Sequence, residues 1–322
     1  MPKPSHLAVL GVGKEVFATP GTPAAATAWV PWKTLTPKDD VNIIEDNGVR
    51  GAPVDNYGQL PGPKGSELDL GGDVFADTIG WPLTSLLPDL VTTGASAPFS
   101  HVASTLCTGD TQPNSHTWTI FDPLGTWQYP GMQFSELGFK WNADGLFEWS
   151  GKAMGWGYAT TTTPTPSFTT VPSIANWAIT NQIAGTPTFV QDGELTIKRG
   201  VTTIRGVAGT QNPYRIWSGD VSVEGKLTLL MESSAQRTIF QAGTAQSFDV
   251  IYTQGAAAAT NGLTLHCTKV TYTDGSPAYG KDYIELPVTF KASGNTSDIG
   301  ASGGYSPIKA TLVNAIASGT YK

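Results

Sequence analysis

The feature that most constrains the fold is an alternation of apolar and polar residues over Asp220–Met231. Every second residue from Val221 to Met231 is apolar or glycine, and the residues between them are polar except for Leu230. A period of two places these sets on opposite faces of a β-strand, one buried and one solvated. The alternation recurs in four further segments: Glu194–Arg199, Ser247–Thr253, Gly262–Tyr272 and Tyr283–Lys291. The second half of the chain is therefore predicted to form an antiparallel sheet with one polar face.

The first half contains a matching hairpin. Gln133–Trp141 and Leu146–Tyr158 flank residues 142–145, whose sequence Asn-Ala-Asp-Gly suits a four-residue hairpin loop. Large residues share one face of the second strand with glycines, which indicates a tight curve or close packing of another backbone.

A run rich in threonine and proline, residues 160–172, separates these two regions. Such a run is extended and packs weakly, so it is predicted to be a linker. We therefore expect a single domain over residues 1–322, built from two similar β halves at about 1–159 and 173–322.

Composition narrows the class of protein. The 322 residues include 37 glycines and 23 prolines, a density that excludes a helical bundle or coiled coil. The 32 aromatic residues exclude wholesale disorder. Only 14% of residues are charged, the net charge is −7, and the basic residues are scattered. A general nucleic-acid-binding surface is therefore not expected, because phosphate binding needs clustered lysine and arginine.

One helix is predicted, with Asp77 as its cap. Its apolar stripe has helical spacing and ends near Pro88, and it consists of Ile79, Leu83, Leu86, Leu87 and Leu90. Asp46–Gly72 is predicted to be a long irregular segment because it is rich in glycine and proline. The pattern of Pro307–Ile316 fits a helix or a strand.

The sequence contains few residues that indicate a catalytic, phosphate-binding or metal-binding site. Cys107 and Cys267 are expected to be buried thiols, and the four histidines form no His-Glu-x-x-His motif. Gly11–Glu15 resembles a phosphate-binding loop but has Glu15 where that loop needs serine or threonine, and Ala8 where its first glycine belongs. We expect no catalytic, cofactor-binding or metal-ligating residues. We also expect no secretory signal and no membrane span, so that the protein is made in a cytoplasm.

A sugar-binding or sugar-cleaving β-sandwich remains an alternative. Acidic residues are numerous between Asp39 and Asp77, and glycoside hydrolysis needs only two carboxyl groups at the correct separation. Tryptophans could bind sugars, although core or interface anchoring is the commoner role of such residues. The tryptophans in or beside predicted strands are Trp118, Trp127, Trp141, Trp149 and Trp217.

The order of several short motifs resembles the tail tube (major tail) proteins of long-tailed, siphovirus-like bacteriophages. The opening residues 11–23 match the pattern Gly-x-Gly-Lys-Glu-x-x-x-x-Pro-Gly-Thr-x of that family. The later segments that are similar, in order, are Trp29–Trp32, Ile44–Gly51, Asp73–Leu90, Gly131–Gly155, Gly219–Met231 and Ile284–Phe290. Asn56–Gly65 and the linker depart from the family pattern.

This resemblance implies a mainly β fold: an antiparallel β-sandwich or barrel with one short helix and long extended arms. It implies subunits that close into hexameric rings with a shared inner β-barrel, and rings that stack into a tube. Phage DNA and the tape-measure protein would pass through the lumen, and tail terminator and distal tail proteins would bind the ends. Proteins of this family are structural components of the virion and are assembled in the bacterial host cytoplasm. The family has a strand near its C-terminus, which favours a strand at residues 310–316. Another ring-forming tail component, such as a terminator, is a further alternative.

Acidic groups in such a lumen would repel DNA phosphates and keep the genome from sticking. We expect one of two sets of side chains to line it. The first set is the polar face of one predicted strand and consists of Asp220, Ser222, Glu224 and Lys226. The second set is a pair of acids on the hairpin of the first half, Glu136 and Glu148.

Overall fold

The computed structural model describes residues 3–322 except 163, 208, 255–259 and 281, so that residue 163 of the predicted linker lies outside the described residues. The first half contains β1 (Val9–Lys14), β2 (Ala28–Val30), β3 (Thr34–Glu45), β4 (Gln59–Asp73), α1 (Gly80–Leu86), β5 (Asp89–Thr93), β6 (Phe99–Ser104), β7 (His116–Asp122), β8 (Gly125–Asn142), β9 (Glu148–Gly155) and β10 (Ala159–Thr160). The second half contains β11 (Ile179–Ile183), β12 (Thr186–Pro187), β13 (Val190–Ile204), β14 (Arg215–Leu230), α2 (Ala235–Ala242), β15 (Gln246–Gln254), β16 (Asn261–Gly275), β17 (Glu285–Ala292) and β18 (Lys309–Asn314). Short 3₁₀ turns lie at Ser5–Leu7 and Asn176–Ala178. The prediction of a mainly antiparallel β fold is confirmed.

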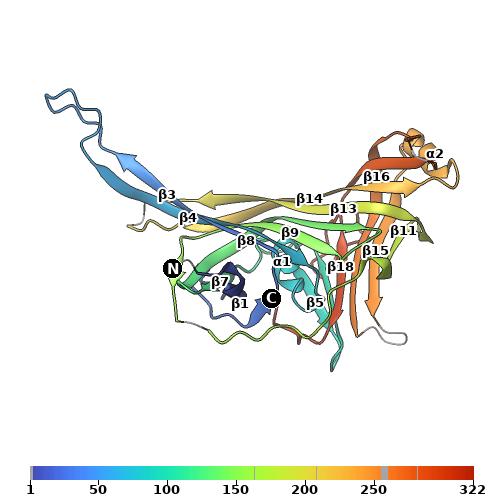
Figure 1. Ribbon diagram of the computed structural model, residues 1–322, viewed down its shortest axis with the longest axis horizontal. Helices are drawn as coiled ribbons and strands as arrows, with labels where there is room; N and C mark the ends of the chain where they lie inside the picture. Colours follow the sequence, from blue (N-terminus) through green and yellow to red (C-terminus); the bar gives the residue numbers. More distant parts are fainter. Residues whose placement is uncertain (1–2, 163, 208, 255–259, 281) are drawn as a thin grey trace.

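The long strands form one layer that spans the molecule (Figure 1). Their order is β3-β4-β9-β8-β13-β14-β17-β16, and every neighbouring pair is antiparallel. The β3–β4 hairpin projects well beyond the body of the protein (Figure 1). Within the described residues this layer is an open sheet and not a closed barrel, because β3 pairs with β4 alone.

Two smaller groups of strands lie beneath the long layer. β8 continues into the group β2-β1-β7-β8-β10. β16 continues into the group β12-β11-β15-β16-β18-β6-β5. The strand option for residues 307–316 is therefore confirmed by β18. Since β8 and β16 each belong to two groups, they tie the layers together.

The core lies between these layers, as the alternation predicts. Inward-facing Leu137, Ile197 and Leu227 are almost fully buried, and α1 beneath them has no exposed residue. Of the five tryptophans expected to anchor the core or an interface, Trp118, Trp141 and Trp149 are buried, whereas Trp127 is half-buried and Trp217 is 40% exposed. Of the two cysteines expected to be buried, Cys267 is buried and Cys107 is exposed.

The prediction of an irregular segment over residues 46–72 is wrong for residues 59–72, which belong to β4. Residues 59–65 pair only with β3, and the register shifts there, with Val41 opposite Lys64 and Ile43 opposite Pro61. Proline is tolerated in a strand that has a single partner and at a bulge. A Cβ at Gly71 or Gly72 would lie 3.1 Å from a backbone oxygen, so these glycines allow close strand packing and do not mark a loop.

The predicted helix is shorter than expected. α1 ends at Leu86, and Leu90 lies in β5. No side chain caps α1, so the prediction that Asp77 is its cap is wrong. A second helix, α2, was not predicted; it ends where Gly243 adopts a φ of 61°. Glycine at this position is a common helix terminator and was the signal for it in the sequence.

Glu15, which ruled out a phosphate-binding loop, is a buried structural anchor. Its Oε1 accepts hydrogen bonds from Thr117 Oγ1 (2.6 Å) and Gly131 N (2.7 Å). Its Oε2 accepts from Ser115 Oγ (2.6 Å) and Gly21 N (2.7 Å). The side chain therefore ties the N-terminal segment to β7 and β8.

Arg199 is a second buried charged residue, and it lies on the apolar face of β13. Its guanidinium donates to the backbone oxygens of Gly219 (3.1 Å), Leu86 (3.1 Å) and Thr111 (2.7 Å). Burial lowers the pKa of Arg199 to about 10. Because Leu86 is the last residue of α1, this side chain joins the second half of the chain to the helix of the first.

His116 gives stability a dependence on pH. The ring is 1% exposed, lies edge-on to Trp81, and has Nε2 3.3 Å from the Tyr321 carbonyl oxygen. Burial lowers the pKa of His116 to about 4. As pH falls from 6.5 towards 4, the unfolded chain takes up a proton that the folded chain does not. The free energy of unfolding should therefore fall by about 3 kcal/mol over this interval through His116 alone.

Urea unfolding of the unassembled chain at pH 7.5 and pH 4.5 tests this expectation. The His116→Gln variant can still donate to Tyr321 and does not titrate, so it should lose much less stability between the two pH values. Burial also lowers the pKa of His101, which adds to the decrease, whereas the hydrogen bond to Asp249 raises the pKa of His266 and opposes it. An equal loss in wild type and variant would contradict a role for His116.

Candidate functional site

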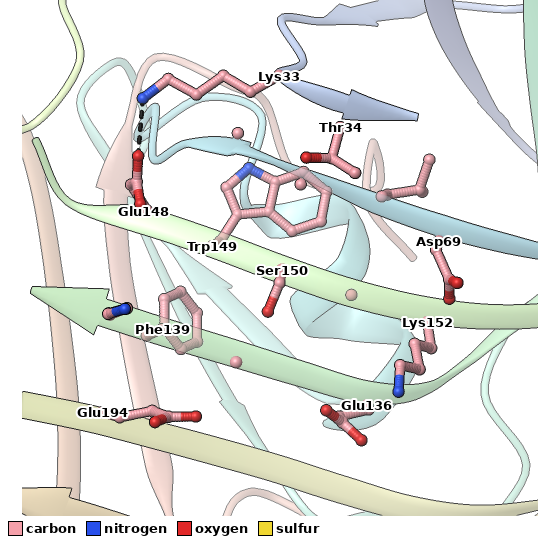
Figure 2. A pocket seen from close by; sticks show the side chains of 16 residues that line it. Lys33, Thr34, Asp69, Glu136, Phe139, Glu148, Trp149, Ser150, Lys152 and Glu194 are labelled. Atoms are coloured by element: carbon pink, nitrogen blue, oxygen red, sulfur yellow. Dashed lines mark hydrogen bonds and ion pairs between the residues drawn. The ribbon is translucent and has the colours of Figure 1, made fainter. Parts of the chain in front are cut away.

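The outer face of the long sheet carries the polar residues that the sequence singled out. This face is formed by β4, β9, β8, β13, β14 and β17, and it contains two shallow hollows. Figure 2 shows the hollow over β4, β9 and β8, where charged side chains point outward from successive strands. The site is therefore a surface built from strand register, not an enclosed pocket.

One row of side chains crosses five strands with alternating charge. Pairing places Asp69 opposite Lys152, Lys152 opposite Glu136, and Glu136 opposite Lys198. Lys198 lies in turn opposite Ser222. Facing residues of opposite charge on neighbouring strands stabilise the pairing, and here each acid has a lysine beside it.

A second row of charged residues lies four residue pairs further along the strands. Asp73 pairs with Glu148, Glu148 with Lys140, and Lys140 with Glu194. Glu194 pairs with Lys226 on β14. The adjacent acids Asp73 and Glu148 need a cation between them for this arrangement to be stable.

Lys33 supplies that cation. Its Nζ lies 2.6 Å from Asp73 Oδ1 and 2.8 Å from Glu148 Oε1, the second contact being visible in Figure 2. Hydrogen bonds to Asp73 and Glu148 raise the pKa of Lys33. The ammonium group thus stays charged at physiological pH and balances the two acids.

Glu224 lies between the two rows and forms an ion pair with Nζ of Lys198 in the first row. The hydrogen bond from Lys198 lowers the pKa of Glu224, and the same bond raises the pKa of Lys198. Lys291 on β17 lies opposite Glu224. Lys198 and Glu224 are both partly exposed, so their ion pair orders the surface more than it stabilises the fold.

The two candidate sets of the sequence analysis occupy one face of one sheet. Glu136, Glu148, Ser222, Glu224 and Lys226 all point to it, as their register shows. Asp220 lies apart, in the register shift of the β13–β14 hairpin between Ser218 and Val221.

Sequence reasoning missed the lysines that neighbouring strands place beside these acids. They are Lys33, Lys140, Lys152, Lys198 and Lys291. Each alternating segment showed its own outward residues, but strand order and register decide which of them become neighbours.

Other reactive side chains do not form a site of this kind. No group of three or more His, Cys, Asp or Glu residues that could hold a metal ion occurs among the described residues. Burial raises the pKa of Cys267, so its thiol stays protonated, and the neighbouring His266 is bonded to Asp249 instead. In the described part of the chain, no helix is long and apolar enough to span a membrane.

Comparison with known proteins identifies a family. A family model described as "Phage tail tube protein" matches residues 5–292, which is most of the chain. No curated protein matches the sequence. The match covers both halves, including every strand of the charged face.

Proposed function

Because this chain belongs to the phage tail tube protein family, we propose that it self-assembles into stacked rings that form the tube of a phage tail. The rings have the hexameric design implied by the motifs it shares with siphovirus-like tail tube proteins, and they share an inner β-barrel. The protein works by assembly and not by catalysis. It acts as the conduit for genome ejection into the host.

The partners follow from this role. Other copies of the chain form the ring and the neighbouring rings, and the tape-measure protein and then the DNA occupy the lumen. Tail terminator and distal tail proteins bind the two ends of the tube. Assembly takes place in the bacterial host cytoplasm, and the finished protein resides in the virion tail.

The charged face of the long sheet is proposed to line the lumen, and its cross-strand charge rows are the observation that supports this most. The first row alternates acids with lysines, and in the second row Lys33 bridges the two acids that face each other. DNA phosphates therefore meet neither a cationic cluster nor an apolar patch. The opposite face is buried against the core and cannot face a channel. A surface whose charges are already paired lets a polyanion slide without binding it.

The distribution of tryptophans supports a tube protein over the carbohydrate-binding alternative. Sugar binding would need several exposed tryptophans on one face of a monomer. Of the ten tryptophans, only Trp177 and Trp217 are exposed. The others are buried or half-buried within the chain, so they form no exposed aromatic face that could bind a sugar.

The Glu224→Lys variant tests the lumen assignment. The substitution removes the acid paired with Lys198 and places four lysines together, with Lys226 and Lys291 nearby. Tubes should form normally, whereas DNA ejection from reconstituted phage should slow several-fold at low salt and recover as salt rises.

The matched control is Glu232→Lys, which makes the same charge change at an exposed residue between β14 and α2. It should leave the ejection rate unchanged. Equal ejection rates in wild type and Glu224→Lys at low salt would contradict the lumen assignment while leaving tube formation intact.

A further inference from the structure

We propose that the chain contains two consecutive copies of one tube-forming unit, and that three chains, not six, close each ring. The closing contact pairs the outer edge of β16 with β3 of the next chain. This inference rests on the proposed tube function and adds the number of chains and the surface through which they join.

The order of elements is the first argument. β1, β2, β3, β4, α1, β7, β8, β9 and β10 are followed by β11, β12, β13, β14, α2, β15, β16, β17 and β18 in the same sequence. Corresponding strands have corresponding partners: β4 pairs with β3 and β9, and β14 pairs with β13 and β17. The β5–β6 hairpin is the additional element of the first unit.

The irregularities in strand register also correspond. In the β3–β4 hairpin, Val41 faces Lys64 and the next pair after the shift is Ile43 with Pro61. In the β13–β14 hairpin the equivalent pairs are Arg199 with Val221 and Val201 with Ser218. Every pair of the first hairpin has an equivalent pair in the second, and the displacement along the sequence is constant within each strand.

A second bulge is repeated between the next two strands of each unit. Phe134 faces Ala153, and after one skipped residue Glu136 faces Lys152. In β16 and β17 the same skip separates two equivalent pairs, which are Tyr272 with Phe290 and Asp274 with Thr289.

A third shift recurs between β7 and β8 and between β15 and β16. It separates His116–Met132 from Trp118–Tyr129 in the first unit, and Gln246–Val270 from Phe248–Cys267 in the second. A bulge is a local choice that a general β architecture does not impose. Three bulges at equivalent positions therefore indicate two copies of one unit.

The junction between the two units shows how units join. β8 of the first pairs antiparallel with β13 of the second, from Glu136 opposite Lys198 to Asn142 opposite Asp192. The equivalents of these two edges are β16 beyond Val270 and the outer edge of β3. Within the described residues neither edge is paired with another strand.

The unpaired edge continues beyond Gly275, the last residue of β16. An isolated bridge joins Ala278 to Glu285, and it is the equivalent of the Lys140–Glu148 pair on β8 and β9. The extended segment therefore reaches the positions that β8 uses to bind β13. Open, complementary edges on one molecule call for a second copy of the same chain.

The long hairpins point to the same partner. The tip of the β13–β14 hairpin rests on the first unit: Lys64 N donates to Gln211 O (2.8 Å), Gln211 Nε2 donates to Pro61 O (3.0 Å), and Arg205 Nη1 donates to Lys64 O (3.0 Å). The equivalent β3–β4 hairpin projects free of the body (Figure 1) and exposes Val49 and Leu60. In the ring it rests on the second unit of the preceding chain, the one whose β16 pairs with its β3.

The bore of the tube sets the number of chains. At a spacing of about 4.8 Å and a tilt of about 40°, the eight strands of one chain occupy about 50 Å of circumference. Two chains, after allowance for side chains, leave a bore of about 20 Å, no wider than a DNA duplex. Three chains leave about 40 Å, which lets the duplex pass with its water. The ring then has six units, in agreement with the hexameric design.

Site-directed cross-linking of assembled rings or tubes tests this closure. In a Cys107→Ser background, which removes the exposed thiol, the Thr36→Cys/Ala278→Cys variant places cysteines at the proposed contact. A short bis-maleimide should convert most of the chains into species of two and three chains, with none larger. The Lys140→Cys/Glu194→Cys variant is the matched control, because its cysteines occupy the equivalent pair within one chain and should cross-link without a gain in mass.

The other outcomes separate this inference from the tube function. A ladder that extends to six chains would overturn the three-chain ring. Hollow tubes seen by electron microscopy without cross-links between chains would overturn the β16–β3 contact, and the proposed function would stand. Failure to form rings or tubes under any condition, with the control pair still cross-linked, would overturn both.

Discussion

Replacing Glu15 with alanine should lower the free energy of unfolding by about 3–5 kcal/mol, the cost typical of breaking a buried charged network. The carboxylate is 2% exposed and accepts four hydrogen bonds from the N-terminal segment, β7 and β8. Alanine leaves two backbone N–H groups and two hydroxyls without an acceptor. The N-terminal segment should also lose protection from proteolysis, because Gly21 is no longer held.

A graded series makes the test specific. Glu15→Gln keeps one acceptor oxygen and should lose roughly half as much stability as Glu15→Ala. The exposed acid Glu232 provides the control, and Glu232→Ala should change the free energy of unfolding by no more than about 0.5 kcal/mol. The measurement is urea unfolding of the unassembled chain. A loss below about 1 kcal/mol for Glu15→Ala would show that the four donors find other partners.

Replacing Arg199 with methionine should cost about 3 kcal/mol. Methionine fills a similar volume, so the loss reports mainly on the three backbone oxygens of Leu86, Thr111 and Gly219 that lose their donors. Arg199→Lys keeps the charge without the planar fork and should recover only part of the stability.

Arg237 on the exposed side of α2 is the matched control for this substitution. Arg237→Met should be close to neutral in the same unfolding assay. Amide hydrogen exchange adds a local readout, because α1 should exchange faster in Arg199→Met if Arg199 anchors its C-terminal end. Unchanged exchange in α1 would contradict that anchoring role.

The sequence predicted the strands best where one face is buried. Residues 220–231 and 133–158 alternate cleanly, and they form the strands around which the sheet is built. Alternation failed for β4, because its prolines and glycines have the same local signature as a loop, and the neighbouring strands that accommodate them cannot be read from the local sequence. Alternation also did not reveal the role of Arg199. This residue lies on an apolar face, where its guanidinium donates hydrogen bonds to backbone oxygens that are distant in the sequence.

The charged face was predicted one strand at a time. The outward direction of Glu136 and Glu224 follows from period two, but their neighbours do not. Strand order joins β8 to β13 and β14 to β17, and no local pattern encodes that order. The pairing of each acid with a lysine is thus a property of register.

The β8–β13 pairing has a consequence for the kinetics of tube growth. Because both strands lie on one chain, this junction forms during folding at an effective concentration set by the connecting chain, whatever the protein concentration. In the proposed three-chain ring, only the junctions between separate molecules obey mass action, so ring formation should scale with a lower power of concentration than for six separate subunits. On this proposal, dilute protein should complete rings that a one-unit chain would leave unfinished.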